Sequence, residues 1–151
     1  MIDVFEELRK KLGRKPVVSY NQEDAYRKCI RNILRIHHMV IAESGEEREI
    51  GLEDALINPM AIEGFCDRLE FCSDCFSKAA MAIDYIANFH PFVEGNKRTS
   101  FELAVRLLRI GGYELDDTEE TYRFIRDVAW GKYNREEVED WLRCNSHVSN
   151  P

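Results

Sequence analysis

The amino-acid sequence predicts an all-α domain, and three of its features support that fold class. Over residues 26–41 apolar side chains recur every three to four residues, the period of a helix with one buried face. The same period returns on both sides of a polar stretch at 90–98. Residues 98–115 carry too little apolar–polar alternation for a sheet. We therefore expect a compact helical domain in which a loop joins two central helices.

Residues 1–43 are expected to form two helices. The first carries Val4, Phe5, Leu8 and Leu12 on one face, and Gly13 and Pro16 end it. A long second helix begins with Asn21 as its N-cap. Its apolar stripe consists of Tyr26, Cys29, Ile30, Ile33, Leu34, His37, Val40 and Ile41. Because His37 falls on this stripe, we predict a hydrogen-bonded core or boundary histidine at that position, and a catalytic part for it is the less favoured alternative.

The segment from 43 to 71 is predicted to be less regular. Residues 43–51 are highly charged and bracketed by glycines, which indicates a loop or a short β-hairpin. Leu52–Leu56 suggests a short helix closed by Asn58 and Pro59. Further apolar contacts are expected from Ile62, Phe65, Leu69 and Phe71.

Two helices are predicted to flank residues 90–98. The upstream helix presents Phe76, Ala79, Ala80, Ile83 and Ala87, and the downstream helix presents Phe101, Ala104, Val105 and Leu108 before Gly111 and Gly112 end it. Residues 113–115 form a brief extended link. Two further helices begin at capping patterns over 117–120 and 134–137. The polar tail Asn145–Pro151 is expected to fray.

Length and charge limit the possible functions. A chain of 151 residues is long enough for one domain, 1–151, with its own core. A formal net charge of −7 provides no positive field for nucleic acid, so binding to DNA or RNA is not expected. No apolar run approaches the ~18 residues of a membrane helix, and the amino end lacks a basic signal-peptide start. We therefore expect no membrane association and a cytoplasmic protein.

The five cysteines are expected to be reduced, because their number is odd and no secretion signal is evident. Cys72 and Cys75 form a C-x-x-C pair beside Cys66, which raises the question of a zinc site. A structural zinc site takes four ligands, and no second C-x-x-C or closely spaced histidine pair follows. Small buried or helix-start residues are the favoured interpretation.

The stretch 90–98, His-Pro-Phe-Val-Glu-Gly-Asn-Lys-Arg, has the composition of a phosphate-binding loop. The first amides of the following helix lack partners within the helix and favour an anion. Gly95 allows a phosphate close to the main chain. Lys97 and Arg98 supply positive charge beside it.

Each remaining side chain of the loop suits one part of a group transfer from ATP. His90 can be a neutral base at cellular pH and take a proton from an attacking hydroxyl. Glu94 can hold Mg²⁺, which prefers one or two carboxylates together with phosphate oxygens and water. Asn96 offers amide donors to phosphate oxygens, and Lys97 and Arg98 can offset charge on the transferred group. We expect Phe92 to anchor the loop in the core.

Residues 90–98 resemble the signature loop of the Fic/Doc family, His-x-Phe-x-Asp/Glu-Gly-Asn-x-Arg, and match all six defining positions. From about Gly51 to Leu142 the chain is similar to death-on-curing proteins, the Doc-like branch, whereas 1–50 match less clearly. The resemblance implies a compact helical domain with the loop between two central helices. It also implies a flap that holds the target protein's chain by strand-like pairing. Residues 45–51 are the candidate flap, in particular Glu47, Arg48, Glu49 and Ile50.

The resemblance implies an ATP- and Mg²⁺-dependent transferase, but two family activities compete. Fic enzymes move AMP onto a Ser, Thr or Tyr hydroxyl, and their loop has a glycine and an arginine where this chain has Lys97 and Phe101. Doc proteins share both departures and act as protein kinases, although Doc has alanine in place of Gly95. Phosphoryl transfer is slightly favoured, and adenylylation is the alternative.

The resemblance also implies regulation by a partner protein. Many Fic proteins carry or meet an inhibitory Ser/Thr-x-x-x-Glu-Gly/Asn helix, and nothing here matches it; Ser19 to Glu23 comes nearest and is followed by Asp24. A separate antitoxin, as in toxin–antitoxin modules, is the natural expectation besides the unidentified protein substrate. A non-catalytic interaction protein is the alternative from another class, and the intact loop argues against it.

Overall fold

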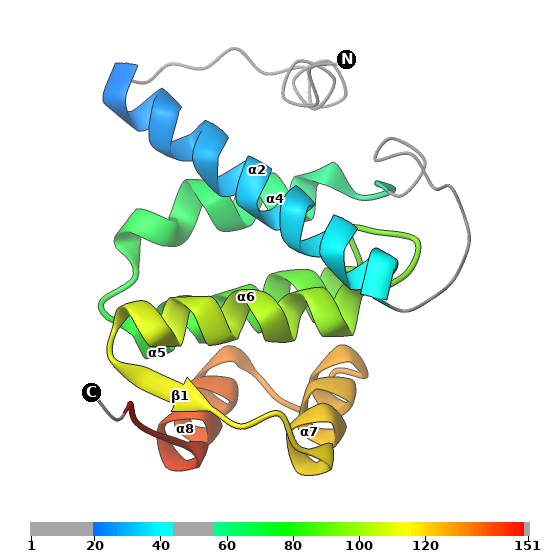
Figure 1. Cartoon of the computed structure of the whole chain (residues 1–151), viewed down its shortest axis with the longest axis vertical. Helices are drawn as coiled ribbons and strands as arrows, with labels where there is room; N and C mark the ends of the chain where they lie inside the picture. Colours follow the sequence, from blue (N-terminus) through cyan, green and yellow to red (C-terminus); the bar gives the residue numbers. More distant parts are fainter. Residues whose placement is uncertain (1–19, 44–55, 150–151) are drawn as a thin grey trace.

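A computed structural model of the chain describes residues 20–43 and 56–149 (Figure 1). These residues are mostly helical, with one small two-stranded sheet, which confirms the predicted fold class. The expected first helix and the candidate flap residues Glu47, Arg48, Glu49 and Ile50 lie outside the described residues. None of the described helices combines the length and the apolarity that crossing a membrane requires.

The described helices form three layers, with an antiparallel pair in the middle (Figure 1). The pair consists of α5 (Cys75–Ile83), continued by the π-helix η2 (Asp84–Asn88), and α6 (Asn96–Ile110). On one face lie α2 (Tyr20–Glu43) and α4 (Pro59–Arg68), the latter followed by the short 3₁₀-helix η1 (Leu69–Phe71). On the other face lie α7 (Glu119–Ala129) and α8 (Arg135–Asn145).

The central pair is buried on both sides, so the domain has two apolar cores. In the first core, Met81, Ile86 and Leu103 of the central layer pack with side chains of α2 and α4 such as Ile33 and Phe65. The second core is formed by the other faces of α5 and α6 together with α7 and α8. Its most buried members include Ala79, Ala80, Ile83, Ala104, Leu108, Ile125, Val128, Val138 and Leu142. Helices buried on two sides cannot move independently of their neighbours.

Local sequence signals explain where the helices begin. Asp74 is the N-cap of α5, and its carboxylate accepts a 2.9 Å hydrogen bond from Ser77 N–H. The predicted capping box of Asn134 and Glu137 is confirmed at the start of α8. The capping pattern predicted over 117–120 is shifted by one residue. The N-cap of α7 is Thr118, whose hydroxyl accepts from Thr121 N–H.

Several predictions for residues 20–71 were wrong. Helix α2 begins at Tyr20, so Asn21 lies inside it and is not its N-cap. Pro59 begins α4 instead of closing a helix, because the first helical position needs no N–H donor. The preceding Leu56 forms an antiparallel bridge with Phe92, while 52–55 lie outside the described residues. Phe71 was expected to make apolar contacts and is 80% exposed.

Residues 145–149 of the carboxyl-terminal tail are ordered where fraying was predicted, while 150–151 lie outside the described residues. Residues Ser146–Val148 form strand β2, which pairs antiparallel with β1 (Tyr113–Leu115), the segment predicted to be an extended link. His147 Nε2 donates to the Asp116 carboxylate at 3.0 Å. The partner strand is more than thirty residues away, so the polar composition of the tail alone did not reveal the pairing.

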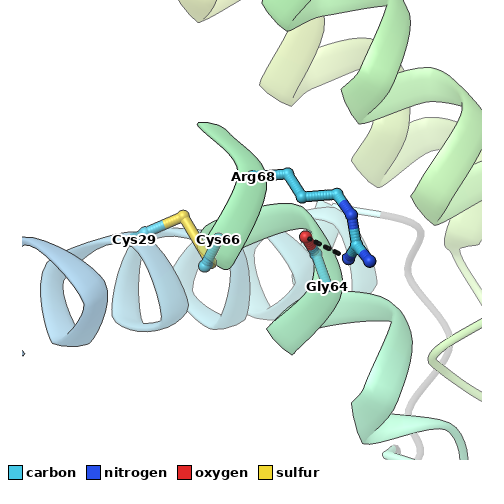
Figure 2. Close-up of a disulfide and its surroundings, with 4 residues drawn as sticks. All are labelled: Cys29, Gly64, Cys66 and Arg68. Carbon is cyan, nitrogen blue, oxygen red and sulfur yellow. Dashed lines mark hydrogen bonds between the residues drawn. A yellow bond between two sulfur atoms is a disulfide. The ribbon is translucent and has the colours of Figure 1, made fainter. Parts of the chain in front are cut away.

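The expectation that all cysteines are reduced was wrong for two of them. Cys29 of α2 and Cys66 of α4 form a disulfide, with their Cα atoms 5.9 Å apart (Figure 2). Cys66 belongs to the first core and Cys29 packs against it, where the two helices meet. A separation of 37 residues hid the pair from sequence reasoning. Cys72, Cys75 and Cys144 are free thiols.

Removing the disulfide should destabilise the domain without changing its fold. The Cys29→Ser/Cys66→Ser variant should lose about 2–4 kcal/mol of unfolding free energy, because the unfolded chain regains the conformations that the cross-link excludes. Denaturant unfolding of the oxidised protein and this variant measures the loss. Cys144→Ser is the matched control and should change stability by less than about 0.5 kcal/mol, since Cys144 is exposed and free. Finding all five thiols reactive in the unfolded, unreduced protein would contradict the disulfide.

Candidate functional site

The predicted loop leaves the central layer at His90, after the π-helix η2 and its C-cap Phe89. His90 is exposed and has a φ of 49°, the only positive φ of a described residue other than glycine. Such backbone conformations persist only where the surroundings impose them, and π-helical turns often accompany functional sites. The π-helix is itself held from α8, since Arg135 donates to Asp84 Oδ2 through Nε and Nη2 at 2.9 and 2.7 Å. The fold therefore presents His90 at a fixed place on the surface.

Two hydrogen bonds from one side chain close the loop. Asn96 Oδ1 accepts from Phe92 N–H at 2.9 Å, and Asn96 Nδ2 donates to Phe92 C=O at 2.8 Å. The Phe92 ring is 1% exposed and lies in the first core, which confirms that it anchors the loop. Asn96 is also buried. Sequence reasoning assigned the Asn96 amide to phosphate, whereas this side chain is bonded to the loop itself.

The first three amides of α6, the open amides, have no hydrogen-bond partner within the helix. Gly95 precedes the helix with a φ of 80°, a conformation that favours glycine. Thr99 N–H donates to Gly95 C=O at 2.9 Å, which makes it the first amide bonded within the helix. The amides of Asn96, Lys97 and Arg98 come before it and have no partner within the helix. A helix terminus of this kind favours an anion.

Helix α2 covers the inner side of the loop. A Cβ atom added to Gly95 would lie 3.2 Å from Ile41 Cδ1, 3.4 Å from Val40 Cγ1 and 3.6 Å from His37 Cδ2. His37 Nε2 lies 2.9 Å from the Glu94 carbonyl oxygen, and its ring stacks on Phe92 with centroids 3.7 Å apart. This confirms the prediction of a hydrogen-bonded core histidine. Sequence reasoning gave no indication that its partner would be the loop.

The His37 ring carries a proton on Nε2. The Glu94 carbonyl can only accept, so Nε2 is the donor. His37 is 2% exposed, and its Nδ1 has no partner among the described residues. Burial lowers the pKa of His37, and this effect outweighs the hydrogen bond to Glu94, which raises it.

The two cations of the loop differ in their surroundings. Lys97 is exposed. The Arg98 guanidinium packs against the Phe101 and Tyr122 rings, at 5.5 and 5.4 Å from their centroids. Its Nη2 pairs with Glu102 at 3.0 Å and with Asp117 at 3.5 Å. A guanidinium has five N–H donors, so Arg98 can bind a further acceptor besides these two carboxylates.

Glu94 is the loop's carboxylate, and it is half-buried. No group of three or more His, Cys, Asp and Glu side chains that could hold a metal occurs among residues 20–43 and 56–149. Mg²⁺ does not require such a group, because one carboxylate, substrate phosphates and water are its usual ligands. Glu94 and the open amides of α6 therefore fit Mg²⁺ together with a phosphate chain.

The segment 56–58 borders the outer side of the loop. The N–H groups of Ile57 and Asn58 both donate to Pro91 C=O, at 2.8 and 3.0 Å. Asn58 Nδ2 donates to Phe89 C=O at 2.9 Å. The loop is thus held by α2 on one side and by the approach to α4 on the other. The candidate flap at 45–51 lies outside the described residues.

The structure brings together most of the residues that sequence reasoning singled out. His90, Glu94, Gly95, Asn96, Lys97 and Arg98 all lie on one short connection and the first turn of α6. Sequence reasoning placed His37 in the core without connecting it to the loop, and it missed Glu102 and Asp117 as partners of Arg98. The pairing of Arg98 with Glu102 could have been found from their i, i+4 spacing on a helix.

Comparison of the chain with protein-family models identifies its family. The family model described as the Fic/DOC family matches residues 29–108, which is more than half of the chain. The matched range includes α4, α5, the whole loop and most of α2 and α6. A search of curated proteins finds no match.

Removing the side chain that closes the loop should be costly. Asn96→Ala leaves two buried backbone groups of Phe92 without partners and should lower the free energy of unfolding by about 2–3 kcal/mol. Asn145→Ala is the matched control, because Asn145 is exposed and makes one bond to the Trp141 carbonyl. Its cost should be below about 0.5 kcal/mol. Urea unfolding followed by circular dichroism compares the two, and equal losses would contradict the account of the loop.

Proposed function

The chain belongs to the Fic/DOC family, whose members transfer groups from nucleotides to proteins, and on this premise we propose an ATP-dependent transferase that modifies a protein Ser, Thr or Tyr hydroxyl. One observation carries the proposal. The exposed His90 and the open amides of Asn96, Lys97 and Arg98 stand at the two ends of one short, tightly held loop. A base and an anion site at this spacing suit attack by a hydroxyl on a bound phosphate.

Each residue of the loop has a role in this proposal. His90 accepts the proton of the attacking hydroxyl. The amides at the start of α6, with Lys97 and Arg98, stabilise negative charge on the transferred group. Glu94 would hold Mg²⁺, and bound Mg·ATP would supply the transferred group and part of the charge neutralisation. Asn96 acts through its backbone N–H and by closing the loop on Phe92.

Phosphoryl transfer, the Doc-like reaction, is favoured over AMP transfer. The Fic pattern uses an arginine at the position of Phe101 to grip the terminal phosphate. Phe101 is 3% exposed and belongs to the second core, so this position offers a nucleotide neither charge nor access. Lys97 occupies the position of the second Fic glycine and is exposed beside the open amides.

Adenylylation remains the second candidate because of Gly95. Its φ of 80° matches the glycine of the Fic pattern, and an alanine, as in Doc, would be strained in this conformation. Gly95 also packs against Ile41 and Val40 of α2, so its conformation is part of the fold.

The proposed biological setting is a toxin–antitoxin module in the cytoplasm, with a separate antitoxin as inhibitor and an unidentified protein as substrate. This part of the proposal rests on the Doc-like features of the loop. The alternative from another class is a non-catalytic interaction protein. An exposed His90 on the same short loop as the open amides favours catalysis over that alternative.

Two labelling reactions test the proposal. The protein is incubated with cell lysate and Mg²⁺, once with ATP labelled on the α-phosphate and once on the γ-phosphate. Transfer from γ alone is expected for a Doc-like kinase, whereas transfer from α would establish adenylylation. His90→Ala should reduce labelling by about 10²–10⁴-fold, the contribution of a general base.

The matched control for this test is His147→Ala. His147 is an exposed histidine on β2, which follows α8 and is not part of the loop. It should be dispensable for transfer. If neither the α- nor the γ-label is transferred and the protein does not bind ATP, the result would instead support the non-catalytic interaction protein.

A further inference from the structure

We propose that His37 is a positioning residue for the transfer reaction: through its contacts with Glu94 and Phe92 it holds the loop in the conformation that binds Mg·ATP. The inference rests on the proposed function for its consequence in catalysis. Its structural half, that His37 sets the conformation of residues 92–96, stands independently of which group is transferred.

The hydrogen bond of His37 is made to Glu94, the residue proposed to bind Mg²⁺. His37 Nε2–H donates to the backbone carbonyl of Glu94 at 2.9 Å, across 57 residues of sequence. Fixing this carbonyl fixes the peptide plane between Glu94 and Gly95, because a peptide unit is rigid. The direction in which Glu94 projects and the left-handed turn at Gly95 both depend on that plane.

The ring of His37 makes a second contact with the same loop. It stacks on the Phe92 ring with an interplanar angle of 7° and a centroid distance of 3.7 Å. The backbone of Phe92 is in turn bonded to Asn96, the first residue of α6. One side chain therefore supports the loop at Phe92 and at Glu94, on either side of Val93.

The backbone that carries His37 is itself well fixed. Its neighbours Val40 and Ile41 lie against Gly95, and Ile33 and Ile36 on the same helix are fully buried or nearly so. Toward the amino end of α2 from His37, the disulfide from Cys29 joins the helix to α4 (Figure 2). A side chain on such a support can hold its target to a fraction of an ångström, which a ligand site requires.

A purely structural histidine would fill the same space, so two variants separate the hydrogen bond from the packing. His37→Phe keeps a planar ring for the Phe92 stack and loses the N–H donor. His37→Gln keeps a side-chain N–H donor and loses the ring. His38→Phe is the matched control on the adjacent, exposed position.

The first readout is amide hydrogen exchange of the protein without nucleotide. Phe92 N–H and Thr99 N–H are bonded within the loop to Asn96 and Gly95, so their exchange reports loop opening. His37→Phe should accelerate both by about five- to tenfold, the loss expected for one hydrogen bond. His37→Gln should recover part of the protection. Unchanged exchange at both amides in His37→Phe would overturn the proposal.

The second readout is the Mg²⁺ dependence of transfer and of ATP binding, measured beside the thermal midpoint. His37→Phe should raise the Mg²⁺ concentration for half-maximal transfer by about 10–100-fold, as for other groups that orient a metal ligand, with little change in midpoint. If transfer and ATP binding fall only in proportion to the thermal midpoint, and equally in both variants, His37 contributes packing alone. That result would overturn the positioning role.

The two readouts also distinguish this inference from the proposed function. A wild-type protein that neither binds ATP nor transfers label would refute the proposed function. Faster exchange at Phe92 and Thr99 in His37→Phe would then still support control of the loop by His37. If His37→Phe fails to fold, the amide exchange and the Mg²⁺ dependence of His37→Gln test the proposal instead. This variant loses the ring stack and keeps the donor, and loss of the stack alone should leave the Mg²⁺ dependence near that of the wild type.

Discussion

The pair of hydrogen bonds between the Asn96 side chain and the Phe92 backbone is the constraint on which the site depends. It ties the first residue of α6 to the middle of the loop, so the helix start and the loop form one unit. The buried Phe92 ring then fixes this unit in the first core. Gly95 can turn with positive φ and leave the first amides of α6 open because the chain on either side of it is already held.

The layered fold explains why this unit lies where it does. The central helices α5 and α6 are buried on both faces, and the loop is the connection at one end of that pair (Figure 1). Helix α2 reaches the same end and supplies His37, Val40 and Ile41 to its inner side. The disulfide joins α2 to α4 within the first core. A disulfide is uncommon in reducing compartments, so its formation depends on where and how the protein is oxidised.

Sequence alone predicted the features that depend on local chemistry. The helical periods, the α8 capping box, the buried Phe92 and the grouping of His90, Glu94 and Gly95 follow from residues close to one another in the chain. Features that depend on distant partners were missed: the Cys29–Cys66 disulfide, the pairing of β2 with β1, and the bond from His37 to Glu94. For Asn96 the residue was correctly placed in the loop, but its amide pairs with Phe92, a choice that becomes visible only once the backbone is folded.

The central claim is that the His90–Arg98 loop is a nucleotide site preformed by its own packing. A crystal structure grown with Mg²⁺ and a non-hydrolysable ATP analogue tests this most directly. We expect phosphate oxygens within hydrogen-bond distance of the Asn96–Arg98 amides, the metal at Glu94, and the Asn96–Phe92 and His37–Glu94 bonds intact. An analogue bound elsewhere, or a loop that must break these bonds to accept it, would contradict the account.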